Sequence, residues 1–347
     1  MRNVPTLCIA VHDEMLAAAL AVPKIRRPLN PEEVLQTRAL RYQRGNAPYP
    51  AWYLFGCRRK GVAGLVDGYA RQASVFLLPE SLLTADVTAD YLDVQFCTLS
   101  RSLLSKFKSR GIKIFGYLPE EFASKAFLAA ALADNGGKHF LPLQRTYGKD
   151  SSPDLPPGEQ SVWIVKSPYG AAGNNSDGTP YTVWQKAVLE ENLPSLLAAL
   201  NKEDKLICSE FVITADPYAH HADHVVHKMP FVADGQAAVP YGRCCQRFIY
   251  RCNWQALAER GSLPLGEFIG TPEITTGDIS RIDAFPDFVE KLSFQRGRLM
   301  LSVDFIIPPD GRPRYLETNK LAATFAEQFD PLLPPLIDYY ARLPLNN

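Results

Sequence analysis

Three oxygen-bearing residues near the end of the chain have types and spacing suited to a hard cation. Asp304 lies within the apolar run 301–307, and Glu317 and Asn319 follow the turn sequence PPDG. Side chains alternate along a strand, so Glu317 and Asn319 share a face, and a hairpin through the turn places Asp304 beside them. Magnesium binds one or two carboxylates, waters and substrate phosphates. The pattern predicts a Mg²⁺ site. A solvated strand face is the alternative, but an unpaired carboxylate inside an apolar run is costly.

A second group of residues has features of a phosphate site. Lys166 ends the apolar run 162–165 and is followed by SPYGAAGNN, which is rich in small residues. A lysine and several backbone N–H groups at such a turn can surround a phosphate chain. The spacing is not that of a P-loop, and an ordinary hairpin with a solvent-seeking lysine is the competing interpretation.

Both groups need strands and helices to position them. Up to about residue 120, apolar runs at 6–11, 51–55, 74–78 and 91–98, a helix at 103–110 and a strand at 112–117 predict an α/β layer. Beyond it we predict a helix capped by Ser124, strands at 161–166 and 205–212, and helices over 187–200 (kinked or restarted at Pro194) and 285–298. The predicted domains are 1–120, 121–212 and 213–347, in an α/β (α+β) fold.

Composition excludes several classes of protein. Lys plus Arg and Asp plus Glu both total 37, so no net charge favours nucleic acid. Seven scattered cysteines do not form a disulfide pattern, and no apolar stretch reaches the roughly 20 residues of a membrane helix. Acidic residues also follow the N-terminus too closely for a signal peptide. We therefore expect a cytoplasmic enzyme that binds neither nucleic acid nor membrane.

Taken in order, these motifs resemble the ATP-grasp superfamily of ligases over residues 125 to 319. The resemblance implies an N-terminal α/β domain followed by a two-part nucleotide-binding region with a mobile lid, and ATP and Mg²⁺ as cofactors. It assigns the phosphates to Lys125 and Lys166, the adenine to a strand and the ribose to an aspartate. The implied cofactor-binding residues are Lys125, Lys166, Gly170, Ala171, Ala172, Gly173, Glu210, Phe211, Val212 and Asp216, and the metal ligands are Asp304, Glu317 and Asn319. Taken alone, Lys125 is an exposed helix lysine and Asp216 a turn former.

One departure from the family pattern concerns an arginine. Many amide-forming members carry one two residues before the first metal carboxylate, where this chain has Ser302. Arg243, Arg247 and Arg251 are the alternative candidates for anion stabilisation, because their spacing of four places them on one face of a helix or of a strand. A solvated basic stripe is the simpler interpretation.

A histidine cluster adds one further question. His220, His221, His224 and His227 fall within eight residues, and His220 and His224 have the spacing of zinc ligands on a helix. Substrate contact or solvent exposure is the favoured interpretation over zinc.

The resemblance implies a carboxylate–amine ligase. A carboxylate would be activated by ATP as an acyl phosphate and then attacked by an amine, with release of ADP and phosphate. An ATP-dependent kinase and a non-catalytic nucleotide-binding protein are the alternatives. The expected substrates are small molecules, amino acids or peptides, in a small-molecule or natural-product pathway, and a homodimer is one open oligomeric state.

Overall fold

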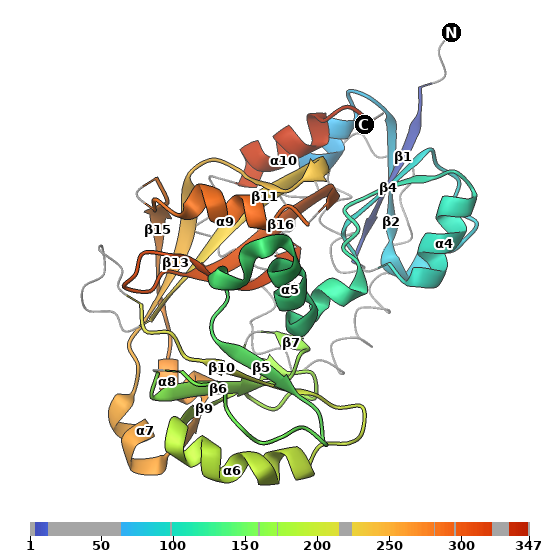
Figure 1. Ribbon diagram of the computed structural model, residues 1–347. Coiled ribbons are helices and arrows are strands. Elements are labelled where there is room, and N and C mark those ends of the chain that lie inside the picture. The colour runs from blue at the N-terminus through green and yellow to red at the C-terminus, as the bar shows by residue number, and fades with distance from the viewer. Residues whose placement is uncertain are drawn as a thin grey trace.

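The structure is a computed structural model, and it describes residues 4–12, 64–97, 99–158, 160–171, 173–214, 224–280, 282–294, 296–320 and 333–345. Within these residues the strands form three main sheets (Figure 1). Helices lie against each sheet, so the predicted mixed α/β class is confirmed. The predicted apolar run at 51–55 lies outside the described residues.

The first sheet is parallel and is built near the N-terminus. Its strand order is β2-β1-β3-β4. The apolar runs expected there become β1 (Thr6–Val11), β2 (Ser74–Pro79), β3 (Tyr91–Phe96) and β4 (Lys113–Phe115). Helix α4 (Arg101–Ser109) begins after Ser100, whose hydroxyl accepts a hydrogen bond from the Leu103 N–H, and packs against one face through Phe107. The helical segment 64–69 and α10 (Leu333–Arg342) cover the other face.

The second sheet is antiparallel, with order β14-β9-β6-β10-β5. Its strands are β5 (Gln144–Tyr147), β6 (Val162–Lys166), β9 (Thr182–Gln185), β10 (Leu206–Glu210) and β14 (Ser262–Pro264). Helix α6 (Lys186–Ala198) covers one face as a single helix that continues through Pro194, so of the predicted kink or restart the restart is excluded. On the other side lie α7 (Trp254–Arg260) and α8 (Leu265–Ile269). Both helices come after residue 212, where we predicted the central domain to end, and yet they pack against the second sheet.

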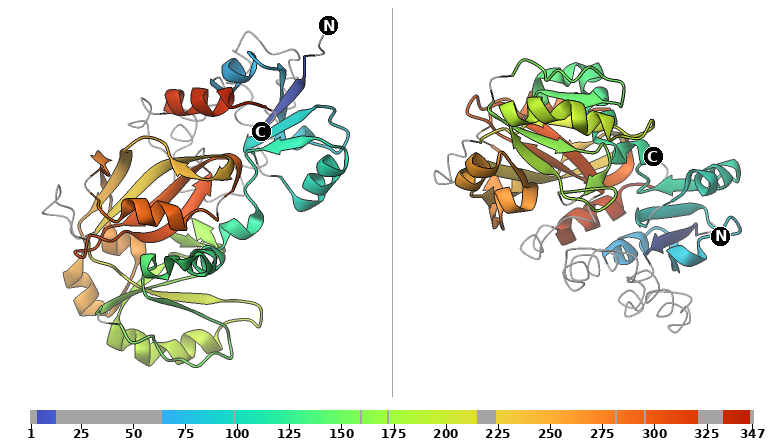
Figure 2. Two further views of the ribbon diagram at one scale, coloured as in Figure 1. Left: turned by 45° about the horizontal axis from the view of Figure 1, so that its top comes forward. Right: turned by 90° about the horizontal axis from the view of Figure 1, so that it is seen from below.

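The third sheet is also antiparallel and forms the middle of the molecule (Figures 1 and 2). Its order is β15-β13-β11-β16-β17, with β12 (Val239–Pro240) paired to β11. The other strands are β11 (His224–Ala237), β13 (Cys244–Tyr250), β15 (Glu273–Asp278), β16 (Arg296–Ile306) and β17 (Arg314–Lys320). Helices α5 (Lys125–Leu132) and α9 (Phe285–Lys291) pack against this sheet around Phe305 and Leu301.

Helix α9 is shorter than the sequence predicts. The expected helix over 285–298 ends at Lys291, and β16 has begun by Arg296. Gly297 has a φ of 116°, which no helix contains, and residues 298–306 pair with the long strand β11. Strand pairing therefore determines the structure of a stretch whose local pattern also suits a helix.

The N-terminal sheet contacts the third sheet at strands β16 and β17. The Gln95 side-chain amide hydrogen-bonds both backbone groups of Met300 at 2.8 and 2.9 Å. Lys320, which ends β17, donates to the carbonyl oxygens of Val94 and Cys97 at 2.8 and 2.9 Å. The carboxyl end of β3 therefore lies close to Asn319.

Candidate functional site

The predicted carboxylate group forms on β16 and β17 as the hairpin pattern indicates. Asp304 pairs directly with Glu317, and Ser302 pairs with Asn319. The Asn319 amide donates to Glu317 Oε1 at 2.9 Å. Gly311, with a φ of 71°, allows the tight turn between the strands. The three predicted metal ligands are therefore neighbours.

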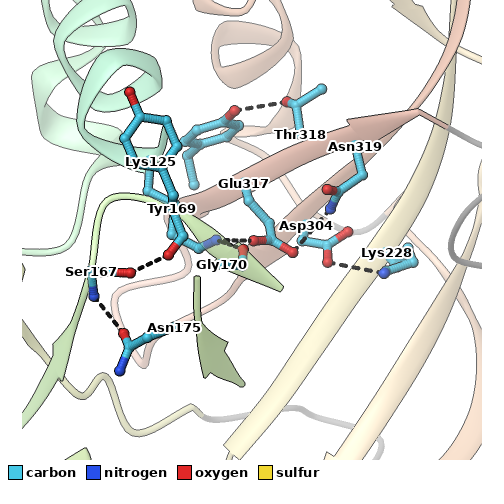
Figure 3. Close-up of polar contacts among 11 residues, drawn as sticks. Lys125, Ser167, Tyr169, Gly170, Asn175, Lys228, Asp304, Glu317, Thr318 and Asn319 are labelled. Carbon is cyan, nitrogen blue, oxygen red and sulfur yellow. Dashed lines mark hydrogen bonds and ion pairs between the residues drawn. The ribbon is translucent and has the colours of Figure 1, made fainter. Parts of the chain in front are cut away.

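Two lysines meet these carboxylates (Figure 3). Lys125, the first residue of α5, places Nζ 2.9 Å from Glu317 Oε2 and 2.8 Å from the Gly170 carbonyl oxygen. Lys228 of β11 approaches from the other side, with Nζ 3.1 Å from Asp304 Oδ2. Lys125 was predicted at this site, whereas Lys228 was not. Its only sequence signal was a lysine inside the apolar stretch 225–233.

Burial and charge affect the two carboxyl groups differently. Burial raises the pKa of Asp304 above its ordinary value, with the Glu317 charge adding to this and Lys228 opposing it. Burial also acts to raise the pKa of Glu317, but the charge and hydrogen bond of Lys125, together with the Lys228 charge and the Asn319 hydrogen bond, outweigh it and hold that pKa below the ordinary range. Glu317 is thus the more firmly ionised of the pair.

The donor set fits a divalent cation. The Oδ1 atom of Asp304 is buried and has no hydrogen-bond partner in the described part of the chain, although buried polar atoms nearly always have one. Two carboxylates and one amide oxygen on adjacent positions are the oxygen donors that magnesium binds. The described part of the chain contains no group of three or more His, Cys, Asp or Glu side chains that could hold a metal ion, so a cation here would rest on two carboxylates and the Asn319 amide oxygen.

The small-residue loop forms a narrow hairpin beside Lys125. Its strands are β7 (Gly170–Ala171) and β8 (Asn174–Asn175), and the Ser167 N–H donates to Asn175 Oδ1 at 2.7 Å. Gly170 has a φ of 144°, and a Cβ there would lie 2.1 Å from the Asn174 carbonyl oxygen. Glycine is therefore required at this position. Ala172 and the side chain of Ala171 lie outside what the structure describes.

Lys166 belongs to the same group of charges. It ends β6, and the next turn is tied to α5 by the Lys125 N–H, which donates to the Pro168 carbonyl at 2.9 Å. Burial lowers the pKa of Lys166 to about 8, and repulsion from Lys125 adds to this effect. An anionic ligand beside Lys166 would favour the charged ammonium and raise this pKa again.

Tyr181 is a further residue that sequence reasoning missed. It is 5% exposed, and its ring centroid lies 5.8 Å from Lys125 Nζ. The hydroxyl lies next to the Lys125 ammonium, which partly offsets the rise that burial causes in the pKa of Tyr181, and a Cβ at Gly170 would lie 2.8 Å from it. A buried hydroxyl therefore faces the region between Lys125 and the glycine loop.

The segment predicted to bind adenine joins the second and third sheets. Phe211 and Val212 are buried, and Phe211 packs on Phe268 at 5.2 Å between ring centroids. The ring of His224 lies 4.5 Å from that of Phe211, and its Nδ1 is 3.0 Å from the Val212 carbonyl oxygen. Glu210 ends β10. Asp216 lies outside the described residues, and the adenine role of 210–212 stays a prediction.

The three candidate arginines are not brought to the carboxylates. Arg247 pairs with His227, and the adjacent pair is Gln246 with Lys228. Lys228 in turn pairs with Asp304, so it is Gln246 that shares the face of the sheet with the carboxylates. Arg247 therefore points to the opposite face, where its guanidinium donates to the Thr276 carbonyl at 2.9 Å. Arg243 and Arg251 are exposed just outside β13. Their catalytic role stays a prediction that this geometry does not favour.

The histidines do not form a zinc site within the described part of the chain. His224 and His227 lie on strand β11, not on a helix, and their odd separation puts them on opposite faces. His227 stacks on Phe305 with 5.2 Å between ring centroids. His220 and His221 fall outside the described residues.

Comparisons with known proteins agree with this architecture. No protein-family model matches the chain, and a search of curated proteins finds no match by sequence. Among solved structures, the chain is similar to the VanG D-Ala:D-Ser ligase from Enterococcus faecalis, with a TM-score of 0.55, 9% identity and coverage of 98% of this chain and 99% of that one.

Two further structures have TM-scores of 0.50. One is the D-alanine–D-alanine ligase from Bacillus anthracis complexed with ATP, at 9% identity, with 98% of this chain and 97% of that chain covered. The other is a RimK domain ATP-grasp protein from Sphaerobacter thermophilus, at 15% identity, with 82% and 95% covered. At these identities the likeness is one of fold. Among the described residues, no helix is both long and apolar enough to cross a membrane.

Proposed function

We propose that this chain, which has the ATP-grasp fold, is an ATP-dependent ligase that joins a carboxylate to an amine. The observation that carries the proposal is the contact between Lys125, which precedes the glycine loop, and Glu317 on the carboxylate hairpin, 2.9 Å apart. This contact places a cation that could bind phosphate next to oxygen donors that could bind Mg²⁺. The ATP seen in a structural neighbour supports the same ligand for this chain.

The cations of the site would hold the phosphate chain of ATP. Lys125 and Lys166 lie beside the glycine loop, and Lys228 lies at the far side of Asp304. Three ammonium groups around one point would neutralise the charge of a triphosphate and of the transferred phosphoryl group. The loop Gly170–Asn175 is the candidate lid over this chain, because it is a two-stranded hairpin standing apart from the main sheets.

Asp304, Glu317 and Asn319 would hold the divalent cation. When bound, Mg²⁺ would supply positive charge that neutralises the negative charge of the phosphates. The residues that hold it are prepared for this: Glu317 is kept ionised by Lys125, and Asp304 has an oxygen without a protein partner. A kinase would need the same residues, so the metal group alone does not separate the two activities.

In the proposed reaction a substrate carboxylate oxygen attacks the γ-phosphorus of ATP. The new O–P bond forms as the bond to the β,γ-bridging oxygen breaks, giving an acyl phosphate and ADP. A neutral amine then attacks the acyl carbon, phosphate leaves with the C–O bond electrons, and the amine loses a proton. Lys228, whose Nζ is 3.1 Å from Asp304 Oδ2, would stabilise the developing oxyanion.

The deciding experiment incubates the protein with Mg-ATP and a panel of carboxylates and amines, alone and in pairs. Released phosphate is measured, and each positive reaction is examined by mass spectrometry. A condensed product together with ADP supports the ligase. A phosphorylated product that is stable without an amine supports the kinase, and ATP binding without turnover of any panel member contradicts both activities for these substrates.

A further inference from the structure

A row of four polar side chains crosses the third sheet at the level of the carboxylates. Gln246 of β13 pairs with Lys228 of β11, Lys228 pairs with Asp304 of β16, and Asp304 pairs with Glu317 of β17. Directly paired residues on neighbouring strands point to the same face of a sheet. Gln246 is therefore the fourth member of the row, and the Proposed function gives it no role.

The side-chain amide of Gln246 has no hydrogen-bond partner among the residues that the structure describes. The residue is 0% exposed, and both Nε2 and Oε1 are buried without a hydrogen bond. Nearly all buried polar groups are paired in folded proteins, so an unused donor and an unused acceptor on one side chain require an explanation. A ligand that offers both an acceptor and a donor would satisfy them together.

The position along the strands places this amide away from the adenine segment. His224, which contacts the Val212 carbonyl, pairs with Tyr250. Gln246 is four residues from Tyr250, about 13 Å along an extended strand. Gln246 lies in the same cross-strand row as Asp304, where we expect the terminal phosphate of ATP. The group that hydrogen-bonds Gln246 would therefore belong to the substrate that receives this phosphate.

The adjacent Lys228 charge disfavours a cationic partner, and a carboxylate could not donate the hydrogen bond that Gln246 Oε1 can accept. Lys228 lies on the neighbouring strand, and its Nζ is 5.7 Å from the centroid of the Phe248 ring, two residues beyond Gln246. An ammonium group brought to Gln246 would be repelled by Lys228, and both nearby carboxylates are already paired with lysines. A secondary amide offers a C=O and an N–H without charge and matches both ends of the glutamine.

We infer that Gln246 binds an amide group of the carboxylate substrate, which makes an N-acyl amino acid or a short peptide the substrate class. The inference rests on the proposed function for the position of the reacting carboxylate. It assigns specificity to a residue outside the nucleotide and metal groups.

The experiment measures binding as well as turnover. Calorimetry with Mg²⁺ and a non-hydrolysable ATP analogue compares free amino acids with N-acetyl amino acids and dipeptides, for the wild type, Gln246→Met and Thr276→Ala. Thr276 is the exposed partner of Gln246 on β15 and serves as the matched control. We expect amide-bearing ligands to bind the wild type and T276A alike, and to bind Q246M at least tenfold more weakly, with nucleotide affinity unchanged.

Each outcome separates the two proposals. Equal binding of amide-bearing ligands to Q246M and wild type, weaker nucleotide binding by Q246M, or no binding of any amide-bearing ligand would overturn the role of Gln246. Binding that depends on Gln246 without any ATP turnover would support it and count against the ligase. A purely structural glutamine would lower the melting temperature when replaced, whereas loss of an unpaired buried amide leaves it equal or higher.

Discussion

Lys125 Nζ and Glu317 Oε2 lie 2.9 Å apart, which joins the residue expected to bind phosphate to the residue expected to bind metal. Without a nucleotide, each therefore neutralises the other. ATP would draw Lys125 toward its phosphates, and Glu317 would then be available to a cation. Phosphate and metal binding should be linked through this ion pair.

This linkage predicts that Mg²⁺ and ADP strengthen each other's binding. We expect Mg²⁺ to bind the wild type about tenfold more tightly with ADP present, a coupling within the usual range for linked sites. Lys125→Met releases Glu317 permanently, so Mg²⁺ alone should bind this variant more tightly while ADP binds more weakly. Calorimetric titrations of Mg²⁺ with and without ADP measure both effects. Identical Mg²⁺ affinity in the two proteins would show that the ion pair does not compete with the metal.

Removing the Glu317 carboxylate should depress turnover and change its dependence on Mg²⁺. Glu317→Ala removes one of two carboxylates, and we expect kcat to fall about 100-fold with a higher Mg²⁺ requirement. Asp310→Ala is the matched control, because Asp310 lies in the same hairpin but pairs with Arg314 at the surface. Steady-state phosphate release across a Mg²⁺ series gives the comparison. Equal loss in both variants would indicate damage to the hairpin instead.

ATP binding should take up a proton at alkaline pH because of Lys166. Its pKa is lowered to about 8 by burial and by Lys125, so the ammonium loses its charge as the pH rises through that value. Bound phosphates favour the charged form and raise the pKa again. At about pH 9 the wild type should therefore bind ATP more weakly than at pH 7 and gain protons on binding.

Calorimetry of ATP binding in buffers of different ionisation enthalpy measures this proton uptake. Lys166→Arg is the control, because an arginine stays charged across this range. We expect its proton uptake to be lower than that of the wild type. Uptake that is the same in both proteins would assign the proton to another group.

The local sequence pattern predicted much of the fold where the same structure is favoured by local sequence and by tertiary packing. The Ser124 cap is confirmed by its hydrogen bond to the Phe127 N–H, and the hairpin of Asp304 and Glu317 follows from strand alternation and one glycine turn. Where pairing with a distant strand decided the outcome, the prediction was wrong. Residues 296–298 resemble a helix end but pair with β11.

The missed site residues were missed for a related reason. Lys228 and Gln246 carry no motif, and they join the site only because β11 and β13 align them with Asp304. Tyr181 was missed because only the folding of the glycine loop brings it to Lys125. Sequence spacing gives the residues of one hairpin, but not the register between strands far apart in the chain.

The buried hydroxyl of Tyr181 should contribute to phosphate binding. Tyr181→Phe keeps the ring beside Lys125 and removes a buried hydroxyl that lies next to the Lys125 ammonium. Losing one hydrogen bond of about 1 kcal/mol to a phosphate oxygen would weaken ATP binding about fivefold. Fluorescence displacement of a nucleotide analogue gives the affinity, and Tyr169→Phe, on the exposed part of the same loop, is the control. If only the melting temperature falls, the hydroxyl has a structural role.

Arg298 should stabilise the protein far more than an ordinary surface arginine. It is 6% exposed and donates to the carbonyl oxygens of Tyr340, Leu343 and Pro344 at the end of α10. The carbonyls at a helix end have no partner within the helix and attract a cation. The guanidinium also lies 4.3 Å from the centroid of the Phe115 ring in the first sheet.

Arg298→Met should therefore cost about 3 kcal/mol of unfolding free energy, since it removes three hydrogen bonds and the contact of the guanidinium with the Phe115 ring. Arg342→Ala is the control, because Arg342 also lies at the end of α10 but forms an exposed pair with Asp338 and should cost about 0.5 kcal/mol or less. Urea unfolding followed by intrinsic fluorescence compares the two. Because Arg298 of β16 joins the third sheet to α10 and the first sheet, we expect the R298M transition to separate into two steps. A single transition shifted no further than that of R342A would contradict this role.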